Sequence, residues 1–328
     1  MEYRILGKTG LNISEISLGT WQVGGKWGSE FNFENAEKIL NTAIDNGINF
    51  IDTADVYSDG LSEKTVGKVV RSRSEEVFIA TKCGRFLDPH TNEAYTTAAL
   101  RKFVEDSLSN LGVERIDLMQ LHCPPTEVYY RPEIFGLFDD LIKEGKIRNY
   151  GVSVQKVEEA LKAIEFEGVS AVQIVFNMFR QRPTELFFKE AKKKHVGIIA
   201  RVPLASGLLT GKFSNSTTFK KDDHRFFNRE GEVFDKGETF SGIDYHLGLQ
   251  AVDELRQVFD ENESLVHKAL QWILTFNEVS CVIPGASSSE QLLSNIDTYK
   301  TKPITEGDLQ KVKVIYEKYI KKEVHHLW

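Results

Sequence analysis

The order of apolar runs and helical segments along the chain is the feature that most limits its fold. Short apolar runs, rich in Val, Ile and Phe, alternate with segments whose apolar residues repeat at helical spacing. The predicted strands are Glu15–Gly19, Asn49–Ala54, Val77–Lys82, Ile116–His122, Asn149–Val154, Ala171–Asn177, Val196–Val202 and Val279–Pro284. A strand–helix unit repeated eight times is typical of a closed (β/α)8 barrel, or TIM barrel, and the competing α/β architecture is an open doubly wound sheet.

The sequence after the first strand favours the barrel. An open dinucleotide-binding sheet would place a GxGxxG motif there, whereas this chain has Gly19-Thr20-Trp21. The 328 residues also run on without a linker or a shift in composition that would divide them. We therefore predict one barrel domain over residues 1–328.

Two additions to the barrel are expected. Tyr3–Leu6 and Leu11–Ile13 flank a Gly-Lys-Thr-Gly turn, which predicts an N-terminal β-hairpin. After the seventh strand, Lys212–His246 has little helical periodicity but many aromatic residues, which favours a packed lid over the barrel mouth; an inert insertion is the alternative. Among the barrel helices, Thr97 is expected to cap one that ends at Gly112.

Charge and cysteine content exclude several classes of protein. The net charge of 41 − 48 = −7 argues against a nucleic-acid binder, which would carry a basic face. Cys83, Cys123 and Cys281 form no CxxC pair, and His122-Cys123 lacks metal-ligand spacing, so neither a disulfide framework nor a metal site is expected. No secretory signal or apolar stretch of ~18 residues is visible. We expect a cytoplasmic protein without membrane partners, whose oligomeric state the sequence leaves open.

Polar residues end three consecutive predicted strands. Asp52 and, in the following loop, Tyr57 lie after the second strand, while Lys82 and His122 end the third and fourth. Because C-terminal strand ends meet at the active-site mouth of such a barrel, these side chains should converge. The lysine charge would lower the pKa of the phenol, the carboxylate would keep the lysine charged, and the imidazole would orient a carbonyl oxygen. The set predicts a proton donor aimed at a carbonyl or alcohol oxygen.

Proton donation to a carbonyl requires a hydride source, which suggests a nicotinamide cofactor. Ser153, Gln173 and Asn177 lie on the fifth and sixth strands, where they would hold it. Exposed backbone amides and a lysine in Leu204–Lys212, and the N-terminus of a helix that Pro284–Gln291 opens, would bind phosphate.

These residues resemble the aldo-keto reductase superfamily along nearly the whole chain. The most specific segment is Asp52-Thr53-Ala54-Asp55-Val56-Tyr57, and Thr81-Lys82, Leu121-His122, Gly151-Val152-Ser153 and Ile283-Pro284-Gly285-Ala286 also match. The resemblance implies a (β/α)8 barrel that binds NADPH in an extended pose and reduces small aldehydes or ketones. It also implies that Tyr57 is the general acid, assisted by Asp52, Lys82 and His122.

The positions matched by this resemblance give the expected contacts. The cofactor is expected to contact Thr20, Trp21, Asp52, Ser153, Gln173, Arg201, Pro203, Leu204, Ser206, Gly207, Leu209, Gly211, Lys212, Gly285, Ser287, Gln291 and Asn295. The substrate is expected to contact Trp21, Tyr57 and His122, with Trp27 and the lid completing the pocket.

Four positions depart from the family pattern around the cofactor. Val154 stands where an Asn is frequent, and Arg201 where a Tyr commonly stacks on the nicotinamide; a planar guanidinium can also stack. Ser287 and Gln291 occupy positions that are usually cationic and hold the 2′-phosphate of NADPH. NADH is therefore the alternative cofactor.

Two other functions fit parts of the same pattern. One is a cofactor-binding regulatory or sensor subunit with little turnover, which would have no need of the intact proton-donor set. The other is a Schiff-base aldolase that uses Lys82. A neighbouring carboxylate would disfavour this function, because it would keep the lysine protonated.

Overall fold

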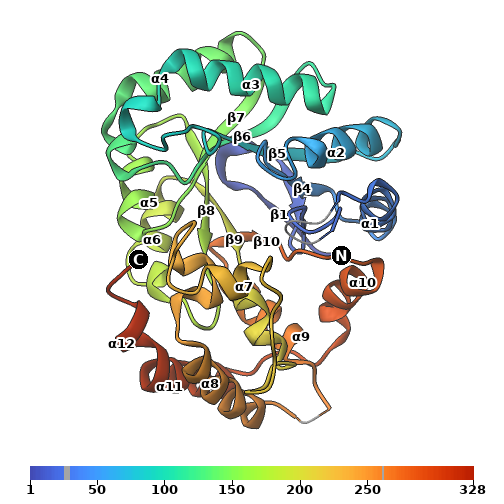
Figure 1. The fold of residues 1–328 in the computed structure, drawn as a ribbon, viewed down its shortest axis with the longest axis vertical. Coiled ribbons are helices and arrows are strands. Elements are labelled where there is room, and N and C mark those ends of the chain that lie inside the picture. The colour runs from blue at the N-terminus through green and yellow to red at the C-terminus, as the bar shows by residue number, and fades with distance from the viewer. Residues whose placement is uncertain (26–29, 261) are drawn as a thin grey trace.

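The computed structural model describes residues 1–25, 30–260 and 262–328, which form a parallel barrel surrounded by helices (Figure 1). The strand order β10-β9-β8-β7-β6-β5-β4-β3 is sequential, and every neighbouring pair is parallel. Parallel bridges between Ile16 and Val282 and between Gly19 and Gly285 join the two edges. The predicted (β/α)8 barrel is therefore confirmed.

The barrel strands lie close to their predicted positions. They are β3 (Leu18–Gly19), β4 (Phe50–Asp52), β5 (Phe78–Cys83), β6 (Ile116–His122), β7 (Ile147–Ser153), β8 (Val169–Val175), β9 (Gly197–Arg201) and β10 (Val279–Val282). Only β6 matches its predicted bounds at both ends. The first strand is shorter than predicted, because most of its pairing with β10 consists of isolated bridges.

Helices follow the strands and cover the outside of the barrel. They are α1 (Phe33–Asp45), α2 (Leu61–Arg71), α3 (Thr97–Leu111), α4 (Pro132–Lys143), α5 (Val157–Ala163), α6 (Phe187–Lys193), α7 (His224–Phe227), α8 (Tyr245–Val258), α9 (Leu265–Leu274), α10 (Ser289–Ile296), α11 (Glu306–Ile315) and α12 (Lys321–Val324). None of the helices in the described ranges is both long enough and apolar enough to cross a bilayer.

The cap of α3 was predicted one residue too late. The Thr96 side chain accepts a hydrogen bond from the amide of Ala99, so Thr96 is the N-cap and Thr97 is the first helical residue. Both threonines have the hydroxyl that a cap requires, but only Thr96 has the extended backbone conformation of an N-cap residue. At the other end Gly112 adopts the expected left-handed conformation, with φ of 64°.

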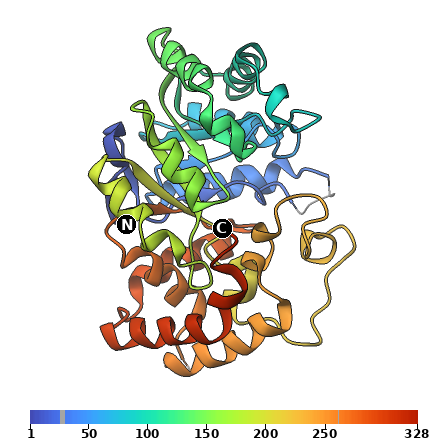
Figure 2. The same ribbon diagram turned by 90° about the vertical axis from the view of Figure 1, so that its left-hand side faces the viewer.

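The N-terminal hairpin closes the end of the barrel at which the strands begin. Its strands β1 (Tyr3–Ile5) and β2 (Asn12–Ser14) pair antiparallel around the short 3-10 helix η1 (Gly7–Thr9), as predicted. Leu6, Leu11 and Ile13 pack with side chains inside the barrel, including Phe50 and Phe78. The hairpin thus seals the end opposite the strand C-termini, and Figure 2 shows it on the side away from the long segment after β9.

That long segment after β9 is compact and mostly irregular. Besides α7 it contains the 3-10 helices η5 (Ala205–Thr210), η6 (Lys236–Glu238) and η7 (Phe240–Gly242), and α8 already begins at Tyr245. The rings of Phe213, Phe219, Phe240 and Tyr245 contact one another, whereas Phe226 is exposed. We call residues 212–246 the lid segment.

Candidate functional site

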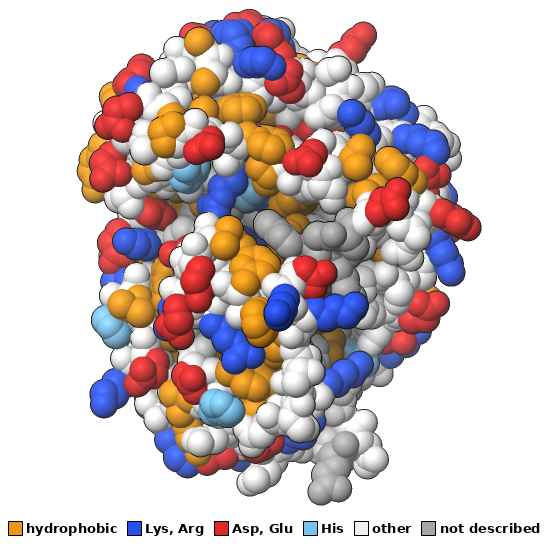
Figure 3. Space-filling model, in the orientation of Figure 1, with side chains coloured by type: hydrophobic (Ala, Val, Ile, Leu, Met, Phe, Trp, Pro, Cys, Tyr) orange, Lys and Arg blue, Asp and Glu red, His pale blue; other side chains and the backbone are white. Residues whose placement is uncertain are grey.

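A cavity of about 820 Å³ opens at the C-terminal ends of the barrel strands. Its walls come from the loops after β3, β4 and β5, from the strands β6, β8 and β9, from η5, and from the start of α10. Phe213, His224, Val233, Phe234 and Glu238 of the lid segment complete the walls. The segment thus lies over the barrel mouth, as predicted. Figure 3 shows this face hollowed near its centre, where basic and hydrophobic side chains meet.

The structure brings Asp52, Tyr57 and Lys82 together at the floor of the cavity. The Lys82 ammonium donates to Asp52 Oδ1 at 2.5 Å and to the carbonyl of Thr53 at 2.7 Å, and its Nζ lies 3.4 Å from the Tyr57 hydroxyl. Lys82 is 1% exposed and Asp52 is 2% exposed. Since a buried charge is stable only when it is paired, each of these two residues requires the other.

Two glutamines complete the environment of Asp52. Gln120 and Gln173 both donate from Nε2 to its Oδ2, at 3.1 and 2.8 Å. Gln173 was predicted to hold the cofactor, and its amide lies at the cavity wall. Gln120 was missed. Gln120 lies between two apolar residues in the middle of β6, so the sequence already indicated that it is buried. A buried carboxamide needs a hydrogen-bond partner, and this need was the signal that could have identified the residue.

The pKa of Tyr57 differs from the sequence prediction. Burial raises the pKa of the phenol above its ordinary value, and the Lys82 charge acts in the opposite direction without reversing the shift. The predicted net lowering is therefore wrong, because desolvation of the phenolate outweighs one ammonium that Asp52 already neutralises. Tyr57 is accordingly a neutral phenol, which is the form that donates a proton.

His122 faces Tyr57 across the cavity floor. The two rings are edge to face, with centroids 6.1 Å apart. Burial, followed by the charges of Lys82 and Arg85, lowers the pKa of His122 well below its usual value, so the imidazole is neutral. Its Nδ1 is buried without a hydrogen-bond partner among the described residues. A neutral imidazole can donate to a carbonyl oxygen from one nitrogen only.

Most of the residues predicted to contact the cofactor line this cavity. They are Thr20, Trp21, Asp52, Gln173, Arg201, Pro203, Leu204, Ser206, Gly207, Lys212, Gly285, Gln291 and Asn295. Four others do not line it. Leu209 is buried in the core, Gly211 lies against Arg256, Ser153 bonds to Gln173, and the Ser287 hydroxyl donates to Gln291 Oε1 at 3.0 Å. Asn177, which was also predicted to hold the cofactor, instead donates from its side-chain amide to the Ser241 hydroxyl.

The turn after β9 has an unusual backbone. Val202, Ala205 and Ser206 have positive φ values of 54°, 46° and 53°, in a region that side chains other than glycine rarely occupy. Such strain persists where surrounding contacts impose it, commonly at ligand sites. Here the Ser206 hydroxyl donates to the carbonyl of Glu238 and accepts from the amide of Phe240, so it ties the turn to the lid segment.

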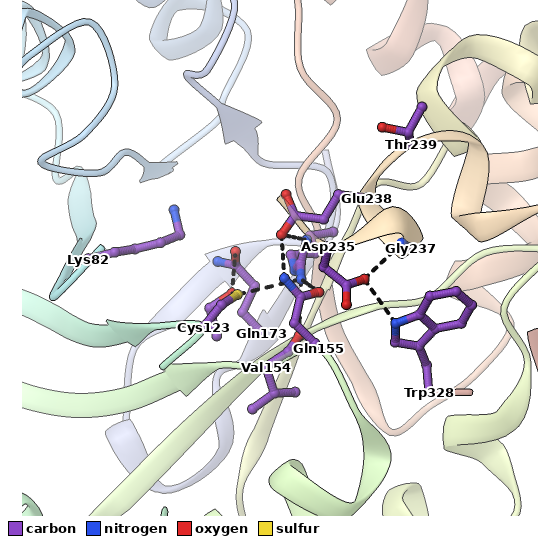
Figure 4. A network of polar contacts seen from close by, with 12 residues as sticks. Lys82, Cys123, Val154, Gln155, Gln173, Asp235, Gly237, Glu238, Thr239 and Trp328 are labelled. Carbon is purple, nitrogen blue, oxygen red and sulfur yellow. Dashed lines mark hydrogen bonds and ion pairs between the residues drawn. The ribbon is translucent and has the colours of Figure 1, made fainter. Parts of the chain in front are cut away.

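Arg201 is held by a second polar network, which the sequence did not predict (Figure 4). Its Nη2 donates to the carbonyl of Val154 at 3.0 Å and to Gln155 Oε1 at 2.9 Å, and its Nη1 lies 3.6 Å from Glu238 Oε1. Gln155 Nε2 in turn donates to the same Glu238 oxygen at 2.5 Å. A carboxylate from the lid segment thus neutralises Arg201 inside the cavity.

The same stretch of the lid segment is anchored beside Glu238. The indole of Trp328 donates to Asp235 Oδ1 at 2.9 Å (Figure 4). The Arg180 guanidinium lies 4.3 Å from the Trp328 ring centroid. A Cβ at Gly237 would lie 2.9 Å from that indole, so the close packing requires glycine. Trp21 lines the cavity as predicted, whereas Trp27 lies outside the described residues.

Asp55, within the family motif, is a buried carboxyl outside the Lys82 network. Burial and the nearby Glu63 raise its pKa from 3.8 to about 7. Its Oδ1 accepts from the amide of Val56 at 2.7 Å, and its Oδ2 has no hydrogen-bond partner among the described residues. The folded protein therefore binds a proton here that the unfolded chain releases near pH 4.

We expect Asp55→Asn to stabilise the protein at high pH only. Between pH 4 and 7 the folded state binds more protons at Asp55 than the unfolded state does, so wild-type stability falls as pH rises through this window. The advantage of the variant should grow toward pH 8, to a value on the order of 4 kcal/mol. Urea unfolding of the wild type and the variant at pH 4.5 and pH 8 measures the difference in their free energies of unfolding. An equal difference at the two pH values would contradict the prediction.

The arrangement fits a nicotinamide cofactor and a small substrate. The cavity volume lies in the range of ~300–1,000 Å³ typical of ligand sites. His122 and Arg201 both line the cavity, and each has a buried nitrogen, Nδ1 and Nε, without a hydrogen-bond partner among the described residues. Within the described ranges, no group of three or more His, Cys, Asp or Glu side chains has an arrangement suited to a metal ion.

Comparisons with known proteins agree with this geometry. Residues 15–317 match the model described as "Aldo/keto reductase family". The chain is 32% identical over 300 residues to the aldo-keto reductase YhdN of Bacillus subtilis, covering 89% of this chain and 87% of the relative. It is 26% identical over 315 residues to a probable voltage-gated potassium channel subunit beta of Arabidopsis thaliana, covering 93% of each.

A solved structure shows the same likeness in three dimensions. The glycerol dehydrogenase of Gluconobacter oxydans superposes with a TM-score of 0.78 at 28% identity, covering 97% of this chain and 96% of that one. The similarity therefore extends over the barrel, the lid segment and the C-terminal helices together.

Proposed function

Because the chain belongs to the aldo/keto reductase family of nicotinamide-dependent oxidoreductases, we propose that it reduces aldehydes or ketones with NADPH and with Tyr57 as general acid. The observation that carries the proposal is the buried Asp52–Lys82 pair with the Tyr57 hydroxyl 3.4 Å from Lys82 Nζ, at the floor of an open cavity. We also place the protein in the cytoplasm.

The side chains would act on the carbonyl oxygen in distinct ways. Tyr57 donates its proton to that oxygen as negative charge develops, and the adjacent Lys82 ammonium stabilises the resulting phenolate. Asp52 holds Lys82 in place and charged; the pKa of Lys82, which burial alone would lower, is raised by Asp52 and Tyr57. His122 orients the oxygen by a hydrogen bond from its neutral ring.

The cofactor, when bound, supplies the hydride that reaches the carbonyl carbon. Gln173 and Arg201 would hold its nicotinamide end, and Arg201, fixed by Gln155 and Glu238, offers a planar group against the ring. Lys212 and Asn295 would bind its phosphate and ribose groups along η5 and α10. Trp21, which also lines the cavity, would contact the substrate.

We expect NADPH to bind more tightly than NADH. Lys212 is a cation at the cavity wall, and the first turn of α10 begins with its Ser288 cap near Gln291, a place that favours anions. Fluorescence titration of both nucleotides tests the preference, and oxidation of NADPH by a panel of small aldehydes tests the activity. Equal affinities would contradict the proposed preference, and the absence of oxidation with every aldehyde would contradict the reductase.

A regulatory subunit is the second candidate, because one relative is named as a potassium channel subunit beta. The two functions differ in a single-turnover experiment. A reductase oxidises its bound NADPH when an aldehyde is added, whereas a sensor retains it. The complete set of Asp52, Tyr57, Lys82 and His122 favours the reductase, since sensing alone needs no proton donor. Pairing of Lys82 with Asp52 likewise disfavours the aldolase.

A further inference from the structure

Among the described arginines and lysines that line the cavity, two have no hydrogen-bond or ion-pair partner from their side chains. Arg201 is held as described above, and Arg225 donates to both oxygens of Asp223, at 2.8 and 2.6 Å. The remaining two are Lys212 and Arg85. An uncommitted cation in a cavity wall is the group that a bound anion would meet first.

These two cations lie on opposite walls of the barrel mouth. Lys212 follows η5, which continues from β9, whereas Arg85 lies two residues beyond the end of β5. In the closed order of eight strands, β5 and β9 are separated by three strands in either direction. Lys212 therefore belongs to the wall proposed for the cofactor, and Arg85 to the wall that faces it.

The local backbone directs Arg85 toward the reacting groups. Gly84, just after β5, has a φ of 99°, and a Cβ there would lie 2.7 Å from the Tyr95 ring, so only glycine allows this turn. Arg85 then reaches the cavity beside His122, whose strand β6 pairs with β5. Its charge is one of those that lower the pKa of His122.

The charges at the substrate end of the cavity are unequal. Asp52 neutralises Lys82 at 2.5 Å, and Glu238 lies 3.6 Å from Arg201. Arg85 has no ion-pair partner among the described residues, but its charge, like that of Arg201, lowers the pKa of Glu238, so one carboxylate serves two guanidinium groups. One positive charge is thus left over beside the groups that would bind the carbonyl oxygen.

We propose that Arg85 binds an anionic group of the substrate, a carboxylate or a phosphate, so that short anionic aldehydes and ketones are preferred over neutral ones. The inference rests on the proposed carbonyl reduction and adds a substrate class to it. Arg85 would be a specificity-determining residue, because a guanidinium can donate two parallel hydrogen bonds to either anion.

Paired substrates test the preference and separate the two anions. Succinic semialdehyde is compared with its methyl ester, and glyceraldehyde 3-phosphate with glyceraldehyde, by initial rates of NADPH oxidation. In Arg85→Gln, kcat/KM for the anionic member should fall by about 10- to 100-fold, while the neutral member changes little. Arg85→Lys should retain part of the preference. The pair with the larger loss identifies carboxylate or phosphate.

Arg115→Gln is the matched control, since it removes the same charge from an exposed arginine at the opposite end of the barrel, just before β6. Equal effects of Arg85→Gln and Arg115→Gln, or no preference for anions in the wild type, would overturn the inference while leaving carbonyl reduction intact. Turnover of neither member of any pair would instead overturn the proposed function.

A binding measurement decides the inference independently of turnover. Calorimetry with succinate and with glycerol 3-phosphate, which contain no carbonyl to reduce, should give affinities that Arg85→Gln weakens and Arg115→Gln does not. Unchanged binding of both anions in Arg85→Gln would overturn the inference even in an active enzyme.

Discussion

Replacing Tyr57 by Phe is expected to reduce turnover by about 10²- to 10⁴-fold, the usual contribution of a positioned general acid. The phenyl ring keeps the cavity wall and the contact with Lys82, whose Nζ lies 4.9 Å from the ring centroid. Binding of NADPH, followed by fluorescence, should therefore stay within a few-fold of the wild type. The initial rate of aldehyde-dependent NADPH oxidation measures the loss.

Tyr130→Phe provides the control for that substitution. Tyr130, in the β6–α4 connection, is 64% exposed and does not line the cavity, so removing its hydroxyl should leave the rate unchanged. Turnover of Tyr57→Phe at the wild-type rate would show that another group supplies the proton.

Replacing Asp52 by Asn is expected to damage both stability and activity. Lys82 would keep a buried positive charge without its counterion, and the new amide would meet the donors of Gln120 and Gln173. Breaking a buried pair in this way typically lowers the free energy of unfolding by about 3–5 kcal/mol. The pKa of Lys82 should fall, since Asp52 is one of the charges that raise it, and turnover should fall with it.

Asp106→Asn separates this effect from the general loss of a carboxylate. Its partner Lys102 lies at 2.6 Å on an exposed face of α3, where such pairs contribute about 0–1 kcal/mol. Urea unfolding of both variants gives the comparison. A loss in Asp52→Asn as small as that in Asp106→Asn would mean that the buried pair does not stabilise the fold.

The barrel could be predicted from the sequence because its pattern is local. Each strand is a short apolar run and each helix an amphipathic repeat, and helix ends such as Gly112 are visible in the residues themselves. The convergence of Asp52, Tyr57 and Lys82 followed from the same pattern, since the ends of adjacent parallel strands must meet. The cap at Thr96 rather than Thr97 shows the limit, because two suitable residues differ only in backbone conformation.

The residues that were missed are defined by contacts between distant parts of the chain. Gln155 and Glu238 are 83 positions apart, and nothing near either residue indicates that they meet at Arg201. The sequence likewise could not indicate the sign of the Tyr57 pKa shift, because that sign depends on how much water the folded cavity removes from the phenol.

The sequence alone therefore determined the strand–helix order, the barrel, and the positions of Asp52, Tyr57, Lys82 and His122, all of which depend on spacing along the chain. Only the tertiary structure decided which of the charged residues have partners: it pairs Arg201 with Glu238 of the lid segment and leaves Arg85 without an ion-pair partner among the described residues of the cavity. Charge pairing depends on distances in space, and the long segment after β9 has no periodicity from which its folded path could be predicted.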